Sequence, residues 1–63
     1  MEENVRFILS RIIMERMELK STLKEISYLM NTKPDIRLSN EIDRILDRLR
    51  FLEIMEQTIR KKI

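Results

Sequence analysis

The 63-residue sequence contains no cysteine, no histidine and no glycine, and it has a single proline. Without cysteine and histidine, the chain can form neither disulfides nor Cys/His zinc sites, and it lacks thiol nucleophiles and imidazole acid–base groups. Without glycine, it also lacks the glycine-rich loops that bind phosphate groups. Small domains usually gain stability from disulfides, a metal or self-association. Self-association is therefore the support that remains.

A large excess of one charge and a long apolar segment are missing as well. Thirteen Lys and Arg residues face eleven Asp and Glu residues, and the resulting net charge of +2 does not by itself indicate a nucleic-acid partner. No apolar segment approaches the roughly 20 residues that a membrane helix requires. The sequence Met1-Glu2-Glu3-Asn4 is acidic where a signal peptide would be basic. We therefore expect a cytoplasmic protein with no nucleic-acid and no membrane partner.

The residues that dominate the sequence are Leu, Ile, Met, Glu, Lys and Arg, which is typical of long helices. Two stripes of mostly apolar positions recur with alternating spacings of three and four, which predicts two amphipathic helices. The first stripe comprises Val5, Leu9, Ile12, Arg16, Leu19, Leu23, Ile26 and Met30. The second comprises Leu38, Ile42, Ile45, Leu49, Leu52, Glu56, Ile59 and Ile63.

The segment Asn31-Thr32-Lys33-Pro34-Asp35 interrupts this periodicity. Pro34 disfavours helix at Lys33, so one continuous helix cannot pass through the segment. Thr32 followed by Asp35 fits an N-cap with an acidic residue three positions later, which places Pro34 in the first turn; Ser39 is the alternative cap. We predict a single domain over 1–63, with helix 1 over about 3–31, a turn over about 31–35 and helix 2 over about 34–62.

Folding the chain at this turn brings the two stripes together in register. Residues whose numbers sum to 68 then meet, from Met30 with Leu38 near the turn to Val5 with Ile63 at the other end. The predicted fold is an all-α, antiparallel two-helix hairpin. The two charged residues of the stripes, Arg16 and Glu56, fall in adjacent layers. Either they pair, which avoids an isolated buried charge, or both reach the rim of a thin core.

Further apolar residues lie outside the two stripes, and Phe7, Met14, Phe51 and Met55 are among them. Two helices alone cannot cover apolar residues on so many faces. We expect a homodimer that forms a four-helix bundle, with a binding surface for another protein as the alternative.

The polar segment Ser39-Asn40-Glu41-Ile42-Asp43 is the candidate site. Ile42 and the preceding Leu38 point into the apolar seam, whereas Ser39, Asn40, Asp43 and Asp47 share one flank of the helix. Judged by residue types alone, this flank is a solvated helix surface. The pairs Glu15-x-x-Glu18 and Glu53-x-x-Glu56 are spacings that arise constantly in charged helices, so we predict no metal site.

The same segment resembles the Ser-Gln-Glu-Leu-Asp signature of the stage-zero sporulation E-like aspartyl-phosphate phosphatases of spore-forming bacteria. In that family, the first helix tends to carry an apolar residue, an Arg four later and another apolar residue three beyond, a pattern matched by Ile12, Arg16 and Leu19. The resemblance covers roughly Leu9 to Arg50. Asn40 departs from the family glutamine: it keeps the amide but withdraws it by one methylene group.

The resemblance implies an enzyme that removes phosphate from an aspartate of a response regulator, stage-zero sporulation protein A, and so delays or prevents sporulation. It implies that Asp43 is catalytic and that Ser39, Asn40, Glu41 and Asp47 bind the partner. No cofactor of its own is needed, because the partner's receiver domain supplies Mg²⁺. Two alternatives stay open: a non-enzymatic helical adaptor or regulatory protein-interaction module, and an RNA-binding hairpin dimer.

Overall fold

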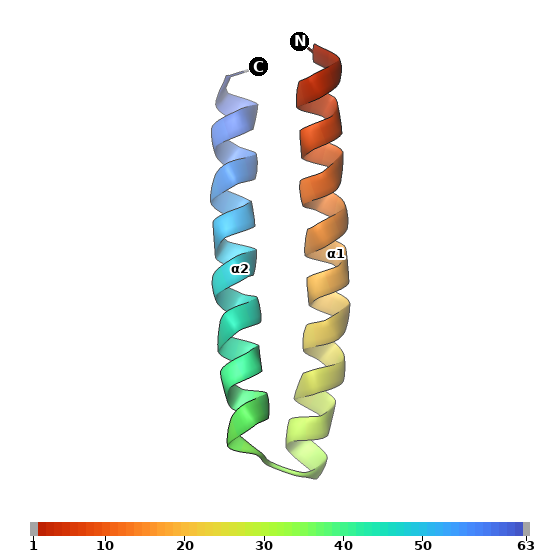
Figure 1. Ribbon diagram of the computed structural model, residues 1–63, viewed down its shortest axis with the longest axis vertical. Helices are drawn as coiled ribbons and strands as arrows, with labels where there is room; N and C mark the ends of the chain where they lie inside the picture. The colour runs from red at the N-terminus through yellow and green to blue at the C-terminus, as the bar shows by residue number, and fades with distance from the viewer. Residues whose placement is uncertain (1, 63) are drawn as a thin grey trace.

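The computed structural model describes residues 2–62, and of residue 2 only the backbone. It consists of two helices, α1 (Glu2–Thr32) and α2 (Ile36–Lys61). The helices lie side by side and antiparallel, so the start of α1 and the end of α2 share one end of the molecule, which we call the open end (Figure 1). The molecule measures 47 × 15 × 12 Å. The predicted all-α hairpin is confirmed.

The two apolar stripes face each other between the helices, as their periodicity requires. Ile12, Ile45 and Leu52 are buried, and Leu52 is only 2% exposed. The other apolar stripe residues are half-buried, namely Val5, Leu9, Leu19, Leu23, Ile26, Met30, Leu38, Ile42, Leu49 and Ile59. The outermost expected partner, Ile63, lies outside the described residues. The core is therefore one seam wide, and it is most tightly closed near Leu52.

The turn differs from its prediction, because α2 is capped by Asp35 and not by Thr32 or Ser39. Asp35 has an extended backbone (φ −148°, ψ 135°), and its carboxylate accepts a 2.9 Å hydrogen bond from the Arg37 N–H. Thr32 instead belongs to α1, where its hydroxyl donates to the carbonyl oxygens of Tyr28 and Leu29. The Lys33 N–H donates a 2.8 Å hydrogen bond to the Leu29 carbonyl oxygen, so the helical hydrogen bonds of α1 continue to the residue before Pro34.

Large apolar side chains remain exposed on the outside of the hairpin. They are Phe7, Ile8, Ile13, Met14, Met17, Tyr28, Leu29, Ile36, Leu46, Phe51 and Ile54. Most of these residues belong to the half of the molecule near the open end, where they lie on several sides of both helices. In the described part of the chain, neither helix is both long and apolar enough to cross a membrane.

Candidate functional site

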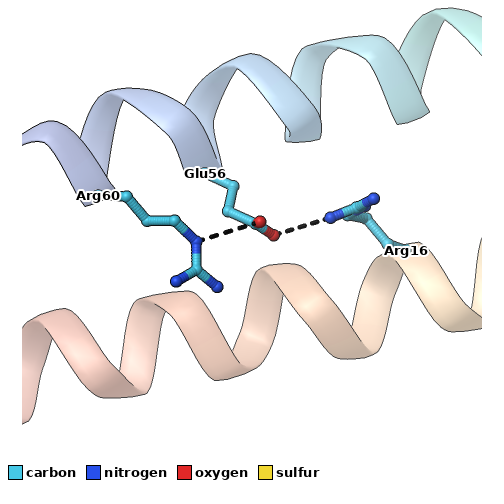
Figure 2. Close-up of polar contacts among 3 residues, drawn as sticks. All are labelled: Arg16, Glu56 and Arg60. Carbon is cyan, nitrogen blue, oxygen red and sulfur yellow. Dashed lines mark hydrogen bonds and ion pairs between the residues drawn. The ribbon is translucent and has the colours of Figure 1, made fainter.

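A layer of charged side chains interrupts the apolar seam near the open end. Arg16 Nη1 on α1 donates a 2.8 Å hydrogen bond to Glu56 Oε1 on α2, and Arg60 Nε donates to Glu56 Oε2 at 3.2 Å (Figure 2). The Glu56 side chain is only 16% exposed. Desolvation raises the pKa of Glu56, but the hydrogen bonds from the two arginines outweigh it, and the pKa lies below its ordinary 4.5. Of the two alternatives for Arg16 and Glu56, the structure shows the pair.

A second ion pair joins the two helices on one flank of the seam, and the sequence did not predict it. Glu15 on α1 accepts two hydrogen bonds from Arg48 on α2, at 2.7 Å from Nε and 3.2 Å from Nη2. These hydrogen bonds lower the pKa of Glu15 and raise that of Arg48. The Arg48 guanidinium also lies 5.1 Å from the centre of the Phe51 ring. We call the side of the hairpin marked by Glu15 and Arg48 the ion-pair face.

The polar residues of the candidate site lie in the first four turns of α2. Asn40, Asp43 and Asp47 are exposed, and Ser39 is half-buried. None of these four side chains hydrogen-bonds to another residue in the described part of the chain. At about 100° per residue, Asp43 points about 140° away from Arg48. We call the side of α2 formed by Ser39, Asn40, Asp43 and Asp47 the motif flank.

The remaining motif residues are placed differently. Glu41 is offset from Asp43 by about 200° around α2, so it lies on the side of the ion-pair face. There it accepts a 3.3 Å hydrogen bond from Arg44 Nη1. Leu38 and Ile42 are half-buried in the seam, which agrees with the structural role predicted for them. The structure therefore groups four of the five predicted site residues and separates Glu41 from them.

The motif flank is a convex helix surface with its polar atoms directed at solvent. Among the residues that the structure describes, no group of three or more acidic side chains is placed to hold a metal ion. Two surface hollows lie on α1, one lined by Lys24, Glu25, Tyr28 and Leu29, the other by Arg11, Met14, Glu15 and Glu18. The motif flank can thus insert carboxylate and amide groups into a cleft of another protein.

Comparisons with protein-family models, with curated proteins and with solved structures gave no match to this chain.

Proposed function

We propose that this protein is an aspartyl-phosphate phosphatase that acts on the phosphorylated receiver domain of a sporulation response regulator. One structural observation supports this: the segment that resembles the phosphatase signature lies on a regular helix with Asp43, Asn40 and Asp47 exposed on one side. A protein that completes the active site of a partner needs such a protruding polar surface and no pocket of its own.

The proposed reaction needs little chemical equipment from the hairpin. A water oxygen forms a bond to phosphorus while the bond between phosphorus and the receiver's aspartate oxygen breaks. The products are inorganic phosphate, the free aspartate carboxylate of the receiver and a proton. The receiver contributes Mg²⁺ and the groups that bind phosphate, and catalysis then depends mainly on positioning the attacking water in line. Asp43 orients this water and accepts its proton.

The hairpin presents Asp43 on a rigid support. Asp35 caps α2 two turns before it, and Ile42 and Ile45 on either side of it in the sequence are held in the seam. Ser39, Asn40 and Asp47 surround Asp43 on the motif flank and contact the receiver. In this arrangement Glu41 meets the partner only if the receiver reaches around α2.

The test follows the lifetime of the acyl phosphate on purified, phosphorylated receiver domains of sporulation regulators, with Mg²⁺ and with or without the hairpin. We expect the wild-type chain to shorten this lifetime. Asp43→Ala should lower turnover by about 10²–10⁴-fold while receiver binding is largely kept, since the lost group acts in the transition state. Asn40→Ala should cost less, because its shortened side chain reaches less far.

Glu53→Ala is the matched control, because Glu53 is an exposed carboxylate of α2 that lies ten residues beyond Asp43 and is not part of the motif flank. It should retain wild-type turnover, and circular dichroism should show that all variants are equally helical. An unchanged phosphate lifetime against every receiver would refute the phosphatase function, and tight binding without turnover would identify an adaptor instead. Full activity of Asp43→Ala would refute the mechanism alone.

A further inference from the structure

We infer that two copies of this chain associate through their ion-pair faces, so that the motif flank of each copy stays open. The two copies are related by a two-fold axis parallel to the long axis of the hairpin, and α1 of each copy packs on α2 of the other. This inference does not depend on the proposed phosphatase function, because it rests on surface area, charge and shape.

The first observation is the amount of exposed surface. The chain exposes 5617 Å², which is about 1,200 Å² more than the roughly 4,400 Å² expected for a globular monomer of its mass. A standard protein–protein interface covers about 800 Å² per partner. Burying one interface of ordinary size would therefore bring the exposed surface area of the chain close to that of a globular protein of the same mass.

The second observation is the distribution of charge on the ion-pair face. Glu18 and Glu25 follow Glu15 on the same side of α1, three and ten residues further along. Arg44 and Arg37 precede Arg48 on the same side of α2, by four and eleven residues. Arg11 lies beside Glu15 and Glu18 on this side of α1, and Glu41 lies among the arginines of α2, where it pairs with Arg44. With these two residues counted, the ion-pair face still has a net acidic edge along α1 and a net basic edge along α2. A face of this kind complements a second copy of itself when α1 meets α2 across a two-fold axis.

The level of each residue along the hairpin supports the same arrangement. The two ion pairs between the helices bracket the register: the residue numbers sum to 63 in Glu15–Arg48 and to 72 in Arg16–Glu56, so residues whose numbers sum to about 68 lie at equal height. Glu25 therefore lies within about one residue of the height of Arg44, and Glu18 within about two residues of the height of Arg48. A two-fold axis along the hairpin leaves these heights unchanged, so the acidic edge of one copy meets the basic edge of the other pair by pair. Within one chain these residues lie on the outer edges of two different helices.

The third observation is an apolar fit at the open end. Phe51 on α2 is 49% exposed, and it is level with Met17. The hollow lined by Arg11, Met14, Glu15 and Glu18 extends to this height on α1 at Glu18. In the proposed dimer, Phe51 of one copy sits over this hollow of the other. The exposed Ile8 and the half-buried Met55 lie beside it on the same face and are covered as well.

The test uses charge reversal and its rescue. The acidic edge is reversed in Glu18→Lys/Glu25→Lys, and the basic edge in Arg37→Glu/Arg44→Glu. Sedimentation equilibrium from low to high micromolar concentration should show a dimer for the wild-type chain. For each double variant alone, the dimer should be on the order of 100-fold weaker, because attraction between the two edges becomes repulsion. An equimolar mixture of the two variants should form a heterodimer of near wild-type affinity, since both of its edges are again complementary.

The control is Lys20→Glu/Lys24→Glu, which reverses two charges on the opposite side of α1 and matches the second double variant in net charge. It should dimerise like the wild-type chain. Three results would overturn the inference: a wild-type monomer at high micromolar concentration, a mixture that stays monomeric, or a control that loses affinity as much as the edge variants do. The last result would place the contact on the motif-flank side.

Discussion

At the scale of single residues, two carboxylates link the helices, and both are stabilised in their charged form. Glu15 and Glu56 each accept two hydrogen bonds from arginine, and the pKa of each is lower than its ordinary 4.5. The reason differs between the two sites. At Glu15, the hydrogen bonds from Arg48 are the largest contribution, whereas at Glu56 the arginines must first overcome desolvation.

These shifts predict how stability depends on pH. A carboxylate with a lower pKa in the folded than in the unfolded chain contributes stability above its unfolded value, here 4.5, and the contribution is lost as pH falls through the folded pKa. The thermal midpoint, followed by circular dichroism, should therefore be constant near neutral pH and decline below about pH 4.5. In Glu56→Gln, the midpoint should be lower at pH 7 and fall less steeply in acid.

Glu53→Gln is the control for this measurement, because Glu53 makes no hydrogen bond to another described residue. Its pH profile should match the wild-type profile. If the Glu56→Gln profile matched it too, the Arg16–Glu56–Arg60 group would contribute nothing to folding.

The Arg16–Glu56 contact was predictable because both charges interrupt the seam in adjacent layers. The Glu15–Arg48 contact was not, because the reach of long side chains across a flank depends on how the helices pack.

At the scale of the helices, periodicity predicted both elements, but local chemistry at the turn was misjudged. Thr32 and Asp35 have the spacing of a capping pair, and Pro34 is tolerated in a first turn, so Thr32 was the expected cap. The structure shows that Thr32 is already used by α1, since its hydroxyl bonds back to two carbonyls of that helix. The sequence did offer the true cap, because Asp is a preferred N-cap residue and Asp35 directly precedes Ile36, where α2 begins.

Substitution of the two candidate caps separates these interpretations. Asp35→Ala removes the acceptor for the Arg37 N–H and should cost about 1 kcal/mol of unfolding free energy. Thr32→Ala removes no cap and gains helix propensity, so it should change stability by less than about 0.5 kcal/mol. Urea unfolding at fixed protein concentration measures both values. A larger loss for Thr32→Ala than for Asp35→Ala would show that α2 begins earlier in solution.

At the scale of the whole molecule, the hairpin is closed by one narrow seam. The matching stripes were sufficient to predict its topology, because only an antiparallel pair brings every apolar layer into register. They could not show which outer face takes a partner, since exposed apolar residues occur on several sides. The face proposed above for a second copy was chosen from where the charged side chains lie relative to the Glu15–Arg48 pair, a contact that only the three-dimensional structure shows.

Two leucines of α2 measure how far stability depends on this seam. Leu52 is 2% exposed and Leu46 is 48% exposed, so the same change to alanine removes very different contacts. Leu52→Ala opens a cavity between the helices and should cost about 2–5 kcal/mol, a large part of the stability of a domain this small. Leu46→Ala leaves the seam intact and should cost less than about 1 kcal/mol. Urea unfolding of both variants, followed by far-ultraviolet circular dichroism at several protein concentrations, gives the two values. Equal losses would mean that Leu46 is buried in solution against a second copy, and the dimer would then use the side of the motif flank rather than the ion-pair face.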